Sequence, residues 1–285
     1  MLTLLDPVLL RLLLPTGVLG QCWPTKMAEI PVPVRSFTVD QLPVDVFASN
    51  DAMSEFVAQH VRSLLADTIA QQGSAAAILA TGNSQIRFLK RLVELGGVDW
   101  SKVTLFHMDE YLGLPADHPA GFRRYMKERV ESLVHPRVFH YLAGDADLPV
   151  VECERYTALL KAQPIDLCCL GVGENGHLAF NDPPVARFDD QAWVKPVKLD
   201  DACKMQQVKE GHFPSLDAVP KYALTLTIPA LIAARNVVCV APEKRKAVPI
   251  RNALKGPVST VCPASILRRQ PHARLLLDVD SAALL

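Results

Sequence analysis

The chain has 285 residues, with 30 basic and 30 acidic side chains that give no formal net charge. Apolar residues make up 49% and charged residues 21%, which excludes an intrinsically disordered chain and supplies enough apolar side chains for a large core. Zero net charge argues against a broad nucleic-acid-binding surface, and the 14 glycines and 22 prolines form no repeat of a collagen-like or low-complexity class.

The N-terminal residues 1–20 are apolar, but they lack the features of a membrane span. Prolines and the charged residues Asp6 and Arg11 interrupt the run, which is therefore too short to cross a bilayer. No basic segment precedes it, as a secretory signal would require. We expect residues 1–36 to be a poorly ordered extension, with Met27 as an alternative start.

The seven cysteines predict reduced, mostly buried thiols. Their number is odd, Cys168 and Cys169 are adjacent in an apolar run, and no pair has C-x-x-C spacing. This pattern fits neither a disulfide framework nor a zinc site. We therefore expect a cytoplasmic protein.

Beyond the extension, helical and strand patterns alternate. Residues 51–70 have apolar side chains at helical spacing, and polar residues at 49–51 can cap the start of this helix. Further helices are predicted over 85–95 and 243–255, and strands over five apolar runs: 75–80, 103–108, 166–171, 236–241 and 273–279. Apolar strands alternating with helices are typical of a mostly parallel sheet covered on both faces. The sequence predicts one doubly wound α/β domain over residues 37–285.

The first candidate site segment follows the strand at 75–80 and opens the next helix. It consists of Thr81, Gly82, Asn83 and Ser84. Glycine lets the backbone approach a ligand, hydroxyls can donate hydrogen bonds, and a helix N-terminus favours an anion. An ordinary capped turn is the alternative. Lys246, near the start of a later helix, could add a point charge for a phosphate, or else lie on a solvated helix face.

Two adjacent carboxylates, Asp109 and Glu110, come directly after the strand at 103–108. Adjacent side chains point in different directions, so at most one of the two faces a common site. A partly desolvated carboxylate at a strand end can act as a general base. The alternative is a helix or turn cap.

The third segment is a loop after the strand at 166–171. Its glycines have G-x-G-x-x-G spacing, at Gly171, Gly173 and Gly176. The residues that follow are not small and apolar, and no acidic residue follows a second strand about 20 positions on, so we exclude NAD binding. Asp182 could hold one ring nitrogen of His177, which could then transfer protons at neutral pH. A structural histidine is the alternative. Since ligands of open α/β sheets bind beyond the carboxyl ends of the strands, the three segments predict one site.

These motifs resemble the glucosamine-6-phosphate deaminase (isomerase) family. The resemblance rests on TGNS at 81–84, FHMDEYLGL at 106–114, LGVGENGHLAFNDP at 170–183, VPKYALT at 219–225 and the surroundings of Lys246. It covers about residues 40–280. It implies a Rossmann-like fold of the sugar-phosphate isomerase/deaminase type. It also implies conversion of glucosamine 6-phosphate and water to fructose 6-phosphate and ammonia, within N-acetylglucosamine catabolism, with no cofactor and no metal.

The resemblance also implies a role for each motif residue. Asp109 resembles the base that moves a proton between C2 and C1 through an enol. His177 resembles the group that opens the sugar ring by protonating the ring oxygen, with Asp182 as its supporting carboxylate and Asn175 beside it. The residues implied to hold the sugar phosphate are Thr81, Gly82, Asn83, Ser84, Gly173 and Lys246.

The chain departs from the family pattern in two places. Asn175 stands where many members have Asp, which leaves His177 with one carboxylate partner. The arginine that clamps the phosphate in many members has no match over residues 201–208, where Val208 ends the segment and Lys204 is the candidate substitute. An ammonium group lacks the bidentate fork of arginine. Pro249, inside a predicted helix, should kink that helix or mark its first turn.

Two alternative functions remain. A 6-phosphogluconolactonase would have arginine after Asp-Glu and threonine after Gly-His, where this chain has Tyr111 and Leu178. A sugar-phosphate-sensing module would need neither Asp109 nor His177, and the presence of both favours an enzyme. The expected partner is a small amino-sugar phosphate, with no nucleic acid or membrane. A homo-oligomer is compatible with the sequence.

Overall fold

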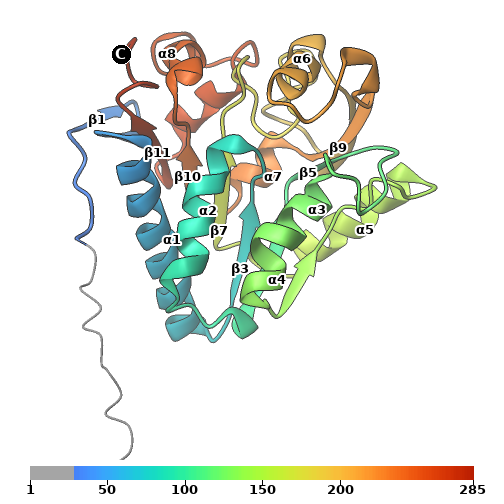
Figure 1. Ribbon diagram of the computed structural model, residues 1–285, viewed down its shortest axis with the longest axis horizontal. Coiled ribbons are helices and arrows are strands. Elements are labelled where there is room, and N and C mark those ends of the chain that lie inside the picture. Colours follow the sequence, from blue (N-terminus) through green and yellow to red (C-terminus); the bar gives the residue numbers. More distant parts are fainter. Residues whose placement is uncertain (1–28) are drawn as a thin grey trace, which may run out of the picture.

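The computed structural model describes residues 29–285, in which eight strands form one central sheet flanked by helices (Figure 1). The strands are β1 (Arg35–Val39), β2 (Leu42–Phe47), β3 (Ala75–Leu79), β4 (Val103–His107), β6 (Val138–His140), β7 (Leu167–Gly171), β10 (Asn236–Val240) and β11 (Ala273–Asp278). They lie in the order β1-β2-β11-β10-β7-β3-β4-β6, and only the β1–β2 pair among them is antiparallel. The predicted mostly parallel α/β sheet is confirmed.

The helices cover the two faces of this sheet. They are α1 (Asn50–Gln72), α2 (Asn83–Leu95), α3 (Phe122–Met126), α4 (Ser132–Val134), α5 (Pro149–Lys161), α6 (Asp201–Lys209), α7 (Ile228–Ile232) and α8 (Ala247–Lys255). Shorter turns are η1 (Trp100–Lys102), η2 (Lys127–Glu131), η3 (Leu216–Ala218), η4 (Lys244–Lys246) and η5 (Pro263–Arg269). Pro249 lies in the first turn of α8, where a missing N–H costs no helical hydrogen bond.

Successive residues of the buried strands enter two different cores. In β3, Leu79 packs in the core formed with α1 and α2, whereas Ile78 packs in the core formed with α5, α7 and α8. This alternation follows from the two-residue period of a strand, and it buries both faces of the sheet. The continuous apolar runs in the sequence therefore correspond to strands covered on both sides.

The first helix shows how the sequence sets the limits of an element. The Ser49 hydroxyl accepts a hydrogen bond from the backbone N–H of Ala52 at 3.1 Å and so caps α1. Gly73 ends the helix with a φ of 83°, a conformation that glycine adopts at little cost. The helix predicted over 51–70 is confirmed, with a slightly greater length.

A second, three-stranded antiparallel sheet was not predicted. It consists of β5 (Asp109–Tyr111), β9 (Tyr222–Leu226) and β8 (Val194–Lys198), in the order β5-β9-β8. The chain passes from β4 through Met108 directly into β5, and the Met108 carbonyl accepts a hydrogen bond from the N–H of Leu226 at 2.8 Å. Asp109 and Glu110 thus belong to a short strand of their own.

The predicted N-terminal extension, residues 1–36, lies largely outside the described residues, as do Met27 and the run at 1–20. β1 starts at Arg35, slightly before the expected domain boundary. No helix of the described part of the chain has the length and apolar character of a membrane span. The six cysteines of residues 29–285 are all unpaired and buried.

Candidate active site

An open pocket of about 1020 Å³, including solvent at its mouth, lies at the carboxyl ends of the central strands. All three segments singled out in the sequence contribute to its lining. Residues 81–84 follow β3, Asp109 follows β4, and residues 172–177 follow β7. Lys246, after β10, also lines the pocket. The parallel order of the strands therefore brings these distant segments to one place.

The turn after β3 has the geometry of an anion site. Thr81, Gly82, Asn83 and Ser84 all line the pocket. Gly82 has a φ of 99° and occupies the N-cap position of α2, where no side chain of residues 29–285 makes a capping hydrogen bond. The first N–H groups of α2 are therefore available to a ligand, and the helix dipole favours an anion there.

Lys246 brings a buried cation to the same pocket. It lies in η4, and its side chain is only 3% exposed. Burial lowers the pKa of Lys246 to about 8, and the neighbouring Arg245 lowers it as well. Burial of the charged ammonium group costs free energy. A phosphate that pairs with it should therefore bind with a favourable electrostatic contribution.

This pKa predicts how affinity for a phosphorylated ligand changes with pH. Below about pH 8 Lys246 carries its proton and can pair with the phosphate; above that pH the free protein loses this charge. We expect kcat/KM to fall as pH rises through 8 while kcat stays nearly constant, because a bound phosphate raises the pKa of the lysine. A pH series from 6 to 10 would check this. The variant Lys246→Arg should move the fall to higher pH, and an unmoved profile would contradict the assignment.

The position and the surroundings of Asp109 suit a general base. It lines the pocket, is 6% exposed, and its Oδ1 is buried without a hydrogen-bond partner in the described structure. Burial, and to a lesser extent the adjacent Glu110, raise the pKa of Asp109 well above its ordinary value. A carboxylate of raised pKa accepts a proton more readily than a solvated one, and the unpartnered oxygen leaves it free to do so.

Glu110, by contrast, stabilises the fold. It is fully buried and accepts backbone hydrogen bonds from Tyr111, Phe122 and Arg123, at 2.9, 3.1 and 2.8 Å. The last two N–H groups belong to the first turn of α3, so the carboxylate caps this helix. Of the two adjacent carboxylates, only Asp109 lines the pocket.

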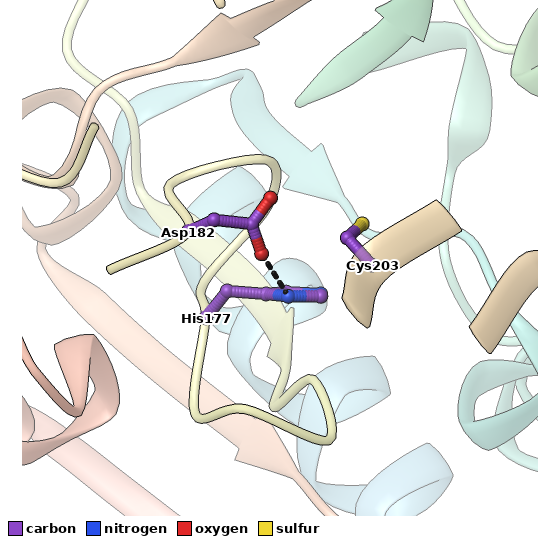
Figure 2. Close-up of side chains that lie close together, drawn as sticks. All are labelled: His177, Asp182 and Cys203. Atoms are coloured by element: carbon purple, nitrogen blue, oxygen red, sulfur yellow. Dashed lines mark hydrogen bonds and ion pairs between the residues drawn. The ribbon is translucent and has the colours of Figure 1, made fainter. Parts of the chain in front are cut away.

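His177 and Asp182 form a hydrogen-bonded pair (Figure 2). The Nδ1 atom of His177 lies 2.8 Å from Oδ1 of Asp182. Burial raises the pKa of Asp182, but the charge of His177 and the hydrogen bonds to the carboxylate outweigh burial, so the pKa is lowered. An ionised Asp182 holds the proton of His177 on Nδ1 and leaves Nε2 for exchange with a ligand.

Asn175 orients both members of this pair. Its Nδ2 donates to Oδ1 of Asp182 at 2.8 Å, and its Oδ1 accepts the backbone N–H of His177 at 3.1 Å. A second carboxylate at position 175 could not donate to Asp182. The asparagine therefore gives the pair a neutral hydrogen-bond donor in place of another negative charge.

The imidazole of His177 packs directly against Gly173. A Cβ atom at position 173 would lie 2.2 Å from both Cε1 and Nε2 of the ring, so only glycine fits. The N–H of Gly173 donates to the carbonyl of His177 at 2.9 Å. The absence of a side chain at position 173 thus leaves room for the ring.

Cys203 is the third member of a group with His177 and Asp182. One ligating atom of each residue lies within 4.8 Å of the others, a nitrogen, oxygen and sulfur set that Zn²⁺ accepts (Figure 2). The Nδ1 of His177 is already bound to Asp182, however. Burial, together with Asp182 and Asp109, raises the pKa of the Cys203 thiol well above its ordinary range. A metal ion would have to displace two protons, so the group fits a metal poorly.

We therefore expect chelation to leave turnover unchanged. Exhaustive dialysis of the purified protein against EDTA should change kcat by less than about twofold. The hydrogen bond to Asp182 already holds His177, so no metal ion is needed to position the imidazole. Metal content measured by elemental analysis before and after dialysis is the control. Loss of activity that zinc restores would show that the Cys203 group is a metal centre.

The structure does not bring Lys204 into the pocket. Its ammonium group pairs with Asp201 at 2.6 Å on α6, and it is not among the lining residues. Helix α6 instead presents Gln206 and Gln207. The sequence did not point to these amides, since neutral residues in a polar helix carry no distinctive signal. The substitution of an ammonium group for the family's clamp arginine is therefore not seen.

Arg245, next to Lys246 in the sequence, is a further lining residue. Its guanidinium is held by carboxylates: Nη1 pairs with Glu210, and Nε pairs with Glu243 at 2.8 Å. Glu174 lies 3.6 Å from the same Nη1. The positive charge of Arg245 is thus largely neutralised within the protein.

The α3–η2 segment forms another wall of the pocket that the sequence did not indicate. Arg124, Tyr125, Glu128 and Arg129 all line the pocket. The hydroxyl of Tyr125 donates to the carbonyl of Gly82 at 3.1 Å, which fastens this wall to the turn after β3. The segment does not follow a parallel strand directly, so the rule that located the other segments could not find it.

The family model described as "Glucosamine-6-phosphate isomerases/6-phosphogluconolactonase" matches residues 48–277. A curated glucosamine-6-phosphate deaminase from Exiguobacterium sibiricum is 36% identical over 207 residues, which are 73% of this chain and 80% of the relative. A second protein of that name, from Halothermothrix orenii, is 35% identical over 213 residues, 73% of this chain and 86% of the relative.

Solved structures show the same resemblance. A monomeric glucosamine-6-phosphate deaminase has a TM-score of 0.78 and 29% identity, and the match covers 85% of this chain and 99% of that one. A 6-phosphogluconolactonase from Shewanella baltica has a TM-score of 0.68 over 85% of this chain and 97% of its own, with 18% identity, which indicates a common fold only.

Proposed function

Because the chain belongs to the glucosamine-6-phosphate isomerase and 6-phosphogluconolactonase family, we propose that it converts glucosamine 6-phosphate and water to fructose 6-phosphate and ammonia. The observation that carries this proposal is the meeting of Asp109, the His177–Asp182 pair and the turn at 81–84 in one pocket. The reaction is an aldose–ketose isomerisation coupled to loss of the amine, and not a simple hydrolysis. The free, buried thiols are consistent with a cytoplasmic enzyme.

The phosphate would bind at the turn after β3. The backbone N–H groups at the start of α2, the hydroxyl side chains of the turn and the ammonium of Lys246 are suited to a dianion. Contacts to a group remote from the reacting carbons can orient C1 and C2 over the catalytic groups.

Ring opening would use His177. In its imidazolium form, stabilised by the ionised Asp182, the ring donates the Nε2 proton to the ring oxygen of the sugar. As the C1–O bond to the ring breaks, the C1 hydroxyl gives its proton to Nε2, which has just lost one, and the open-chain aldehyde results. Gly173, which has no side chain, leaves room for the imidazole in this position.

Isomerisation would use Asp109. The carboxylate removes the proton from C2, which is acidic because it is adjacent to the C1 carbonyl, the C1 oxygen takes up the proton held on Nε2 of His177, and an enol forms. The same proton is returned to C1, which leaves an imine at C2. Water adds to this imine, the amine leaves as ammonia, and the ketose phosphate remains. The raised pKa of Asp109 suits a group that must both accept and return a proton.

A lactonase function is less well supported. The position after Asp-Glu is Tyr111, which is fully buried and packs against Phe122, Phe180 and Phe213. Leu178 is fully buried as well. Neither position supplies the polar side chain that the lactonase pattern would require, and the lactonase structures are too distant to support more than the fold.

The direct test is to incubate purified protein with glucosamine 6-phosphate and to measure ammonia and fructose 6-phosphate. The proposal expects equal amounts of the two products. A parallel assay with 6-phosphogluconolactone tests the alternative. If neither substrate is turned over while glucosamine 6-phosphate still raises the melting temperature, the sensing module becomes the better hypothesis.

A further inference from the structure

Most of the cationic side chains at the proposed phosphate site already form ion pairs within the protein. Four lysine or arginine side chains line the pocket among the described residues: Arg124, Arg129, Arg245 and Lys246. Arg245 is paired with Glu210 and Glu243. Helix α6 presents Gln206 and Gln207 to the pocket, and these side chains carry no charge.

Arg124 is also committed to other groups. Its Nε pairs with Glu128 at 2.7 Å, and its Nη1 donates to the carbonyl of Asp117 at 3.2 Å. Arg129 makes only a long contact to the second oxygen of Glu128, at 4.0 Å. Since Arg124 already holds Glu128, an anion could attract Arg129 without leaving that carboxylate unpaired.

Arg129 is positioned next to the turn after β3. Its Cζ atom lies 4.4 Å from the ring centroid of Tyr125, and the hydroxyl of Tyr125 donates to Gly82 at 3.1 Å. The Tyr125 side chain therefore links the guanidinium of Arg129 to the turn at 81–84. This cation–π contact restricts the Arg129 side chain and so reduces the entropy lost when it binds a ligand.

The local backbone is consistent with a binding role. Arg129 lies in η2, a π-helical turn that continues from α3. Such turns are rare and occur frequently at functional sites. The side chain is 43% exposed and lines the pocket, so it is accessible to a ligand there.

We propose that Arg129 binds the phosphate of the substrate together with Lys246, and that it supplies the guanidinium that α6 lacks. This inference rests on the proposed sugar-phosphate substrate, but it concerns only the binding of the phosphate. The two cations come from different parts of the chain, the π-helical turn and η4, and both line the same pocket.

The test measures binding as well as turnover. Dissociation constants for inorganic phosphate and for glucosamine 6-phosphate would be determined by calorimetry for the wild type, Arg129→Gln, Arg129→Lys and a control, Arg87→Gln. Arg87 lies on α2 near the same turn but outside the pocket lining, where it pairs with the exposed Asp51. Loss of one charge-assisted contact should weaken phosphate binding about tenfold in Arg129→Gln.

The controls separate phosphate binding from a structural effect. Arg129→Lys keeps the charge and should recover part of the affinity, and Arg87→Gln should bind as the wild type does. In turnover assays Arg129→Gln should raise KM by a similar factor and change kcat little, because the phosphate is remote from C1 and C2. Melting temperatures of all variants test for unfolding.

A dissociation constant for phosphate in folded Arg129→Gln that equals the wild-type value would overturn the inference, even if deamination is demonstrated. Conversely, Arg129-dependent phosphate binding without ammonia release would support the inference and refute the proposed reaction. The two proposals can therefore fail separately.

Discussion

The variant Asp109→Asn is expected to lose turnover by about 10³-fold or more while it binds phosphorylated ligands almost as tightly as the wild type. The amide cannot accept the proton from C2, yet it has nearly the shape of the carboxylate. Asp109 does not belong to the turn or the cations that are suited to the phosphate. Ammonia release and calorimetric binding of glucosamine 6-phosphate, measured on the same preparation, would check both parts of this expectation.

The wild-type pH profile provides an independent control on this assignment. Asp109 must be ionised to accept a proton, and burial raises its pKa well above 3.8. Activity should therefore be lost as pH falls through this raised pKa, at a pH well above that of a solvated aspartate. An Asp109→Asn protein with substantial residual activity, or one that no longer binds phosphate, would show that Asp109 has a structural role.

The variant His177→Gln is expected to affect the cyclic substrate much more than an open-chain one. Glutamine cannot carry a proton to the ring oxygen, so we expect kcat for glucosamine 6-phosphate to fall about 100-fold. An analogue without the 5-hydroxyl group cannot form the pyranose ring and bypasses this step. Its rate should fall by less than about threefold, since Asp109 remains in place. Steady-state kinetics with both compounds would measure the difference.

The matched variant for this experiment is Asn175→Ala. It keeps the imidazole but removes the hydrogen bonds at 2.8 and 3.1 Å that orient Asp182 and the His177 backbone. It should show a smaller loss in the same direction as His177→Gln. If His177→Gln slows both substrates equally, the histidine acts after ring opening or supports the fold, and the assignment is wrong.

Most segments of the pocket could be predicted from the sequence, because each is marked by a short motif of neighbouring residues. Glycine and hydroxyl residues at strand ends, such as Gly82 and Ser84, identify turns that must face a ligand in a parallel sheet. The apolar runs predicted the parallel strands of the central sheet for the same reason, since burial on both faces leaves a continuous pattern.

The features that the sequence did not predict depend on contacts between distant segments. β5 has only three residues, two of them acidic, and it exists because β9 pairs with it. The α3–η2 wall that carries Arg129 is joined to the turn after β3 by the hydrogen bond from Tyr125 to Gly82, two residues far apart in the sequence. Lys204 has a suitable charge for a phosphate, but the ion pair with Asp201 directs it elsewhere. Neither the sequence spacing nor the residue type records such pairings.

The small second sheet has a consequence for how the enzyme acquires activity during folding. Asp109 lies in β5, whose partner β9 comes much later in the chain, and Lys246 follows β10, which comes later still. The large sheet closes an even longer loop, because β11 pairs with β2. Contacts that close such long loops form late, because their entropy cost is not offset until both segments are ordered. The phosphate site and the catalytic carboxylate therefore both depend on late contacts, and phosphate binding and catalysis should recover together during refolding.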